Sequence, residues 1–289
     1  MVHRIEHHRM LTNGIHLHVA QCGPADGPLV VLLHGFPEFW YGWRRQLGAL
    51  AAAGFRVWAP DQRGYNLSDK PRRVRDYAID QLAADVPGLI DAAGHATAAV
   101  VGHDWGAAVV WHLAAHHPAR IGRAAVLNVP HPQALARALT RQPRQVLKSW
   151  YVFFFQMPWV PEALLRLRRW WAVRRALRRS SRPGTFSAAD LVLYQVAWAR
   201  PGAMSSMVNW YRAAARFARR LGATGRVRVP LCIIWGWDDA FLNANLAQES
   251  LAFCDDGRLT YLPATHWVQH EATAKVNELL IEFLQEPSL

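Results

Sequence analysis

The sequence predicts an α/β protein, with a mostly parallel eight-stranded sheet flanked by helices and a helical segment inserted into the chain. Short continuous apolar runs, such as residues 29–33, are typical of strands that are buried on both faces. Helical stretches alternate with these runs, which favours right-handed crossovers between parallel strands. The alternation stops at Pro132 and resumes at Arg228, so the residues between them are predicted to form the insertion.

Each element of the predicted core has its own signal. Residues 5–12 and 15–21 alternate loosely around the hairpin turn Asn13-Gly14, which predicts antiparallel strands at one edge of the sheet. The later strands are predicted at residues 29–33, 55–59, 98–101, 124–127 and 231–235, with a last strand ending near residue 262. Helices are predicted at residues 41–53, 79–93 and 105–116. In such a sheet, catalytic groups are expected at the carboxyl ends of the strands.

The insertion is predicted to form a helical cap over those strand ends. Its helices are expected at residues 150–155, 161–179, 188–199 and 203–221. In the second of these, apolar residues recur at helical spacing between arginines, at Ala163, Leu167, Trp170, Val173 and Leu177. We therefore expect residues 1–131 and 221–289 to form the two parts of the core, and residues 132–220 to form a cap that shapes a pocket.

The net charge of +12 is concentrated in this predicted cap. Residues 132–220 contain 17 Lys and Arg but only Glu162 and Asp190 as acids, whereas the rest of the chain contains 16 basic and 19 acidic residues. Only three of the 33 basic residues are Lys, which is typical of codon use in a GC-rich genome. The functional alternatives are contact with an anionic membrane surface or with nucleic acid, and no recognition motif supports nucleic acid.

The cysteines and the lengths of the apolar runs limit the classes of protein to which the chain can belong. Three scattered cysteines predict neither a disulfide framework nor a zinc site. Residues 1–10 lack the apolar core of a secretory signal, and no apolar run approaches the ~18 residues of a membrane span. We therefore expect a cytoplasmic protein, monomeric or homodimeric, with peripheral membrane contact through the basic cap as an open alternative.

The strongest chemical signal is Gly102-x-Asp104-x-Gly106, which lies between a predicted strand and a predicted helix. Glycines at both positions allow the strand and the helix to approach closely at a sharp turn, with the central side chain pointing out of the sheet. Asp104 is ionised near neutral pH and can attack an electrophilic carbon without first losing a proton. The attack would leave an alkyl ester on the enzyme. Taken alone, the motif is equally typical of an Asp that caps the following helix.

Hydrolysis of such an ester needs a base that activates water and a group that orients the base. Asp239 follows the predicted strand at residues 231–235, and His266 lies in the loop after the last predicted strand. The chain order Asp104, Asp239, His266 is a known order of nucleophile, acid and base in sites built on a strand, a sharp turn and a helix. Asp238 competes with Asp239 for the role of the acid, and we favour Asp239.

Backbone N–H groups at the same edge of the sheet are candidates for an oxyanion hole. The stretch His34-Gly35-Phe36-Pro37-Glu38 follows the first buried strand, and the N–H groups of Phe36 and Trp105 would stabilise an oxyanion. Pro37 is also a candidate for a cis peptide bond, because such bonds occur in tight turns.

These stretches resemble the α/β-hydrolase-fold epoxide hydrolases over almost the whole chain. The matching stretches are residues 34–38, 61–65, 102–106, 235–239 and 266–267. In the cap, Tyr151-x-x-x-Phe155-Gln156 and Asn209-Trp-Tyr211-Arg212 resemble the segments that carry the two acid tyrosines of that family. The resemblance implies that Asp104 attacks a ring carbon while Tyr151 and Tyr211 hold and protonate the epoxide oxygen. It further implies a vicinal diol as product, with an epoxide and water as reactants and with no metal or organic cofactor.

Two alternatives stay open from the sequence. A haloalkane or haloacid dehalogenase would use the same Asp104, Asp239 and His266, but it needs halide donors instead of proton donors. Phe36 stands where many haloalkane dehalogenases have Asn, and Trp105 replaces the Arg that follows the nucleophile in haloacid enzymes. A ligand-binding or peripheral membrane protein on this fold would not need an intact set of all three residues. We therefore favour an epoxide hydrolase, and the aromatic and leucine residues of the cap predict a largely apolar substrate.

Overall fold

An eight-stranded sheet forms the centre of the computed structural model, which describes residues 4–222 and 224–286. The first three residues of the 1–10 stretch lie outside this part of the chain. The strands are β1 (Glu6–Thr12), β2 (Ile15–Cys22), β3 (Leu29–Leu33), β4 (Arg56–Pro60), β5 (Ala98–His103), β6 (Ile121–Leu127), β7 (Leu231–Gly236) and β8 (Gly257–Leu262). Their order across the sheet is β1-β2-β4-β3-β5-β6-β7-β8.

The direction of the strands agrees with the prediction. The hairpin β1-β2 lies at one edge, and β2 pairs antiparallel with both β1 and β4. From β4 across the sheet to β8, each strand runs parallel to the next one. Strand β3 is buried along its whole length, as its continuous apolar run indicates. Strand β6 begins at Ile121, earlier than predicted, because Gly122 and Arg123 interrupt the apolar run without interrupting the strand.

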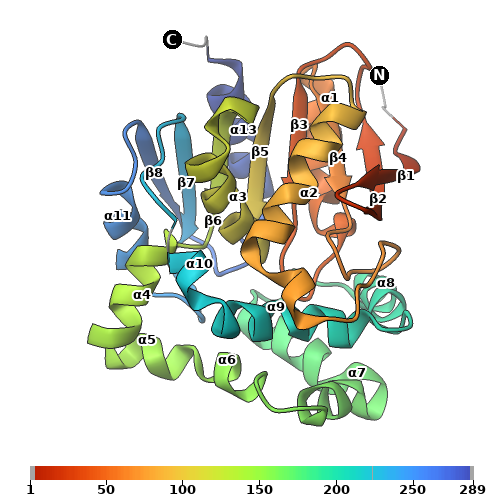
Figure 1. The fold of residues 1–289 in the computed structure, drawn as a ribbon, viewed down its shortest axis with the longest axis vertical. Coiled ribbons are helices and arrows are strands. Elements are labelled where there is room, and N and C mark those ends of the chain that lie inside the picture. Colours follow the sequence, from red (N-terminus) through yellow and green to blue (C-terminus); the bar gives the residue numbers. More distant parts are fainter. Residues whose placement is uncertain (1–3, 223, 287–289) are drawn as a thin grey trace.

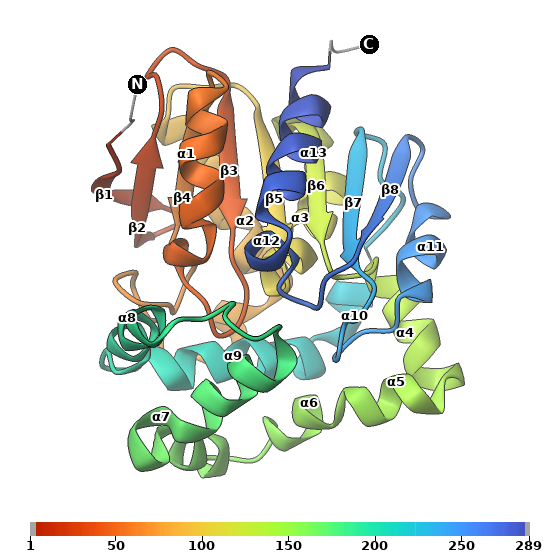
Figure 2. The ribbon, with the colours of Figure 1, turned by 180° about the vertical axis from the view of Figure 1, so that it is seen from behind.

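Helices cover both faces of the sheet (Figures 1 and 2). On one face lie α1 (Arg44–Ala52), α12 (Val268–Glu271) and α13 (Thr273–Gln285), and on the other lie α2 (Ile79–Ala92) and α3 (Trp105–His116). Helix α11 (Asn245–Leu251) lies beside β8, and the short 3₁₀ helices are η1 (Trp40–Trp43), η2 (Val74–Tyr77) and η3 (Pro118–Arg120). Each face of the sheet packs into its own hydrophobic core, so burial of apolar area holds the layers together.

In the described part of the chain, seven helices lie between β6 and β7 and occupy the space at the carboxyl ends of the parallel strands (Figures 1 and 2). They are α4 (Pro132–Arg141), α5 (Pro143–Lys148), α6 (Trp150–Phe154), α7 (Val160–Ser180), α8 (Ala188–Trp198), α9 (Ala203–Arg216) and α10 (Ala218–Gly222). We use the word cap for these helices and their connections. The division of the chain into core and cap at residues 131 and 221 stays a prediction. None of the described helices is both long enough and apolar enough to cross a membrane.

The predicted apolar stripe of α7 is wrong in its first half. Ala163 and Leu167 are exposed, whereas Val173 and Leu177 are buried and Trp170 is half-buried. The backbone leaves helical geometry at residues 167–170, where three successive residues have positive φ angles of 48°, 54° and 64°. This turn reorients the second half of α7 relative to the first, so one stripe does not run along the whole segment.

Candidate active site

Asp104 occupies a sharp turn between β5 and α3, with φ of 50° and ψ of −124°. A Cβ atom on Gly106 would lie 2.0 Å from the carbonyl oxygen of Leu33, and one on Gly102 would lie 2.4 Å from backbone atoms of Gly106. A Cβ atom on Gly35 would lie 2.3 Å from the Asp104 side chain. Only glycine therefore fits at these close approaches, which hold Asp104 in a strained conformation that L residues rarely adopt.

The structure brings Asp104, Asp239 and His266 together. The Nδ1 atom of His266 lies 2.8 Å from Asp239 Oδ2, and its Nε2 atom lies 3.5 Å from Asp104 Oδ2. The other oxygen of Asp239 accepts hydrogen bonds from the N–H groups of Phe241 and Leu242, at 2.7 and 3.0 Å. The competing acid at position 238 is 67% exposed and faces Arg182 instead. The geometry therefore favours Asp239 as the partner of the histidine.

The two carboxylates change the protonation of His266. Burial alone would lower the pKa of His266, but the charges and hydrogen bonds of Asp239 and Asp104 outweigh it and raise this pKa to about 10. Burial acts to raise the pKa of Asp239, yet His266 and the hydrogen bonds to the carboxylate keep that pKa below its ordinary value. In the free protein, His266 therefore holds a proton between two ionised carboxylates at neutral pH.

This arrangement should make the protein less stable at high pH. The folded pKa of about 10 lies above the ordinary value of 6.5, so folded His266 binds its proton more tightly than unfolded His266 does. The resulting stabilisation is complete below pH 6.5 and is lost as the pH rises through about 10. We expect His266→Gln, which cannot titrate, to lose less free energy of unfolding than the parent protein between these pH values, by roughly a few kcal/mol. Urea unfolding at several pH values measures both losses, and equal losses would contradict the raised pKa.

Backbone N–H groups lie beside the Asp104 carboxylate, as the sequence predicts. The Phe36 N–H donates a hydrogen bond of 2.7 Å to Asp104 Oδ1, and the Phe36–Pro37 peptide bond is cis. Trp105 is the first residue of α3, so its N–H has no partner four residues earlier within the helix. The two carboxylate oxygens of Asp104 thus have different surroundings, because Oδ1 accepts from the backbone and Oδ2 faces His266.

Tyr151 of α6 and Tyr211 of α9 lie together near Asp104. Their ring centroids are 5.9 Å apart, and the ring of Trp105 lies 4.9 Å from that of Tyr211. Burial, followed by the negative charge of Asp104, raises the pKa of both phenols above the ordinary value. Both side chains therefore hold their protons at neutral pH, as proton donors must.

The side chains of Asp104, His266, Tyr151 and Tyr211 line one cavity of about 600 Å³ between the cap and the sheet. Arg168 and Ser180 add further polar groups to its lining. The rest of the wall is largely apolar and includes Phe36, Phe155, Leu165, Val173, Phe241 and Trp267. No cluster of His, Cys, Asp and Glu within residues 4–222 and 224–286 is arranged to hold a metal ion.

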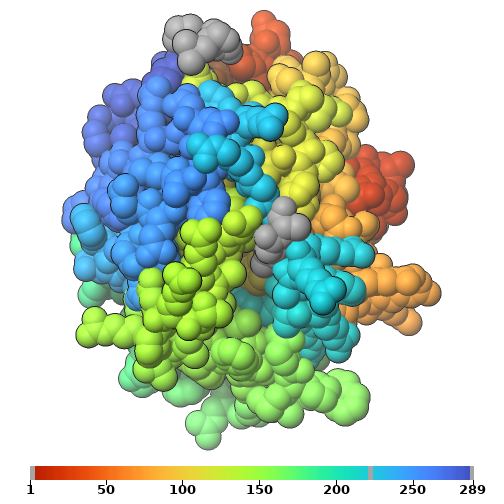
Figure 3. All heavy atoms as spheres, turned by 60° about the vertical axis from the view of Figure 1, so that its left-hand side comes forward, coloured from red at the N-terminus to blue at the C-terminus, as the bar shows by residue number. Residues whose placement is uncertain are grey.

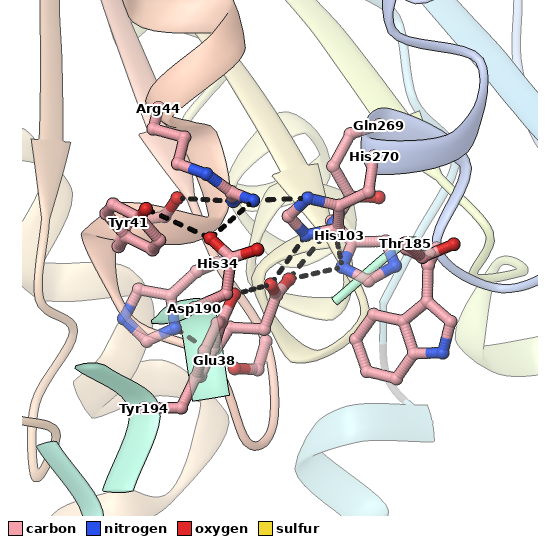
Figure 4. A network of polar contacts seen from close by, with 12 residues as sticks. His34, Glu38, Tyr41, Arg44, His103, Thr185, Asp190, Tyr194, Gln269 and His270 are labelled. Atoms are coloured by element: carbon pink, nitrogen blue, oxygen red, sulfur yellow. Dashed lines mark hydrogen bonds and ion pairs between the residues drawn. The ribbon is translucent and has the colours of Figure 1, made fainter. Parts of the chain in front are cut away.

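A buried network of polar side chains, shown in Figure 4, was not predicted from the sequence. At its centre is Glu38, which is 2% exposed. Its carboxylate accepts hydrogen bonds from Tyr194 at 2.5 Å, His270 at 2.7 Å and Gln269 at 3.0 Å. His103 lies 3.4 Å from the same carboxylate and donates a hydrogen bond of 2.8 Å to the carbonyl oxygen of His266. The network therefore joins helix α8 of the cap to the loop that carries His266.

Two further residues support Asp239, and neither was among the site residues predicted from the sequence. Asn128, with a φ angle of 52°, follows β6 and donates a hydrogen bond of 2.8 Å from its amide to Asp239 Oδ2. Lys148 at the end of α5 reaches across from the cap and donates a hydrogen bond of 2.8 Å to the Asp239 carbonyl oxygen. The loop that presents Asp239 is thus held from the sheet and from the cap.

The chain matches a known family of proteins over most of its length. Residues 28–273 match the family model described as alpha/beta hydrolase fold, and the sheet and the turn at Asp104 agree with that match. The protein is therefore an α/β hydrolase. It is 47% identical over 275 residues to the AB hydrolase superfamily protein YfhM of Bacillus subtilis (strain 168). The aligned region covers 95% of this chain and 96% of that protein.

Several relatives of this chain within the α/β-hydrolase family are epoxide hydrolases. The chain is 34% identical over 285 residues to Epoxide hydrolase 4 of Homo sapiens, across 96% of this chain and 78% of that protein. The crystal structure of a Bacillus megaterium epoxide hydrolase in complex with an inhibitor superimposes with a TM-score of 0.89 at 29% identity, across 96% of this chain and 100% of that one. The chain belongs to the epoxide hydrolases of the α/β-hydrolase fold, which confirms the resemblance stated from the sequence.

Proposed function

We propose that this protein hydrolyses largely apolar epoxides to vicinal diols through an ester on Asp104. The observation that carries the proposal is the convergence of a carboxylate, a histidine paired with Asp239, and two protonated tyrosines on one cavity. The family supports the reaction class, because an epoxide hydrolase needs a nucleophile for carbon and a proton donor for oxygen. The same family membership argues against the dehalogenase alternative.

In the first half of the reaction, Asp104 Oδ2 attacks a ring carbon and the ring C–O bond breaks. The released oxygen takes the phenol proton of Tyr151 or Tyr211, since an alkoxide is a far stronger base than a phenolate. The proton held by His266 then restores the tyrosine. This transfer leaves a neutral ester on Asp104 and a neutral imidazole on His266. The pKa of His266 falls at this stage, because esterification removes the charge and the hydrogen bond of Asp104 that help to raise it.

In the second half, neutral His266 removes a proton from water, and the hydroxide attacks the ester carbonyl carbon. Asp239 stabilises the imidazolium ion that forms. The N–H groups of Phe36 and Trp105 stabilise the oxyanion, which develops on the oxygen that already accepts from Phe36. Collapse of this intermediate breaks the bond to the alkyl oxygen, which takes the remaining hydroxyl proton. The diol leaves, and the ionised Asp104 beside protonated His266 is regenerated.

The walls of the cavity support an apolar substrate. A volume of about 600 Å³ lies within the range of ordinary small-molecule sites, and most of the lining is aromatic or aliphatic. A mutant of the Bacillus megaterium epoxide hydrolase, 29% identical to this chain, was crystallised with its product, a naphthyloxy-propanediol. We propose neutral epoxides with an aryl or alkyl substituent as substrates, with water as the only other reactant.

Release of diol by an Asp104 variant tests the proposal. The parent protein should convert styrene oxide to the diol, whereas Asp104→Asn should reduce the rate at least about 10³-fold, because a neutral amide is a poor nucleophile. Asp238→Asn is a matched control, because this acid is exposed, lies near Arg182 and is not among the residues that line the cavity. Chromatography of the diol measures both rates. Full activity of Asp104→Asn, or an equal loss in Asp238→Asn, would contradict the assignment.

A further inference from the structure

The outer layer of the cap exposes a dense group of apolar side chains. Helices α5, α6 and α7 form the layer farthest from the sheet, and Figure 3 shows single side chains of the green segment projecting from this end (Figures 1–3). Ten of the 17 exposed large apolar residues in the described chain lie between residues 146 and 171. Among them, Trp159 is 82% exposed, Leu147 is 73% exposed and Phe153 is 64% exposed. We use the term outer cap face for the exposed residues of these three helices and of the connections between them, within residues 144–179.

Arginines surround these apolar residues and lack acidic partners within the described chain. Exposed arginines of the outer cap face that form no ion pair include Arg144, Arg166, Arg175, Arg178 and Arg179. Both acids of the cap form ion pairs elsewhere, because Glu162 pairs with Arg212 and Asp190 pairs with Arg44 of the core. The positive charge of the outer cap face is therefore not neutralised by the protein itself.

The mouth of the substrate cavity lies in this face. Five residues between 150 and 171 are exposed to solvent and also line the cavity, namely Trp150, Leu164, Leu167, Arg168 and Trp171. An apolar molecule that lies against the outer cap face would therefore be at the opening that leads to Asp104. The exposed aromatic residues and the site are continuous, rather than separate features of the surface.

Exposed aromatic residues beside unpaired arginines match the chemistry of one kind of partner. Trp and Phe favour the interfacial region of a bilayer, and arginines bind the phosphates of anionic lipids. A second copy of this face would bring two strongly positive surfaces together, which disfavours a dimer there. We propose that the outer cap face docks on the surface of an anionic membrane, with Leu147, Phe153 and Trp159 inserted among the lipids. Given the proposed function, apolar epoxides dissolved in the membrane then reach Asp104 directly through the cavity mouth.

Sedimentation of the purified full chain with vesicles tests the docking. We expect binding to phosphatidylcholine vesicles with about 30% phosphatidylglycerol, at least about tenfold weaker binding without the anionic lipid, and release by high salt. Leu147→Ser/Phe153→Ser/Trp159→Ser should weaken binding more than about tenfold, because these exposed apolar side chains would leave water on docking. None of the three lines the cavity, so the substrate site stays intact. The matched control Leu11→Ser/Leu67→Ser/Trp237→Ser changes exposed apolar residues of the core and should bind like the parent.

The charged part of the face is tested in the same assay. Each basic residue at an anionic surface strengthens binding about fivefold, so Arg166→Gln/Arg175→Gln/Arg178→Gln/Arg179→Gln should weaken binding more than about 100-fold. No binding by the parent protein, or an equal loss in the core control, would overturn the proposal. Binding to duplex DNA that the apolar variant retains in full would also overturn it, as would a dimer that the apolar variant abolishes in vesicle-free buffer.

Turnover separates this proposal from the proposed function. Both cap variants should convert dilute, water-dissolved styrene oxide at the rate of the parent protein, because a small neutral substrate gains little from electrostatic steering. With an apolar epoxide incorporated in anionic vesicles, the parent should be at least about tenfold faster than either variant. Vesicle binding without any diol release would reject the proposed function and leave the docking intact. Diol release at equal rates in both conditions by all proteins would overturn the docking.

Discussion

Replacement of His266 by Gln is expected to stop the reaction at the ester. In the proposed mechanism Asp104 attacks as an ionised carboxylate, so alkylation should not need a neutral histidine, whereas hydrolysis of the ester needs a base for water. We expect steady-state diol release to fall at least about 10³-fold while the first, alkylating step continues. Intact-protein mass spectrometry after mixing with styrene oxide should show a gain of one whole epoxide, and peptide mapping should place it on Asp104.

The added mass also reports the class of reaction. A dehalogenase given a haloalkane would gain the alkyl group alone, because the halide leaves in the first step. Asp104→Asn is the control and should show no adduct at short times, since its side chain is a poor nucleophile. An adduct on another residue, or full diol turnover in the absence of His266, would reject the mechanism.

Among changes that leave Asp104 in place, the largest effect on the first half-reaction is expected from Tyr151→Phe/Tyr211→Phe. We expect each phenol to stabilise part of the charge that develops on the epoxide oxygen, because the two rings lie 5.9 Å apart and both line the cavity. Each single change should slow ester formation by roughly 10²-fold, and the double change should slow it by about 10⁴-fold or more. Stopped-flow or quenched-flow alkylation in a His266→Gln background measures this rate without interference from hydrolysis.

Tyr261→Phe provides the matched control for the two cap tyrosines. Its hydroxyl donates to the Ala244 carbonyl oxygen, and its ring stacks on Trp237 outside the cavity. The control should alkylate at the parent rate. If the double cap variant also alkylates at the parent rate, the epoxide oxygen must find its proton elsewhere, and the two tyrosines would be only packing residues.

Strong local signals made much of the fold predictable. Strand β3 and helix α3 occur with the bounds that the sequence predicts, because a fully apolar run and a glycine-framed turn leave few other structures. Strand ends in a parallel sheet meet at one edge, so placing Asp104, Asp239 and His266 after strands was enough to predict that they meet. Their distances in the structure agree with that prediction, whereas their chemical roles await the experiments above.

Features that depend on contacts between distant segments were not predictable. Helical periodicity in α7 did not predict the turn at residues 167–170. The spacing of apolar residues indicates which side of a helix is buried, but it does not indicate where the backbone leaves helical geometry. Glu38 was noticed only as part of a matching stretch, since its partners come from α8 and α12. Lys148 was one of 17 basic residues in the cap, and nothing local distinguishes it from the others.

The long connection between β6 and β7 can change in length and sequence during evolution. The two strands are neighbours in the sheet, although the chain leaves at Leu127 and returns only at Leu231. The entropy of closing such an excursion grows with the logarithm of its length, so doubling it adds only about 0.6 kcal/mol. Insertions, deletions and reshaped helices in this excursion therefore have little effect on closure of the sheet. Evolution can remodel the walls of the cavity while Asp104, held by glycines in the β5-α3 turn, stays unchanged.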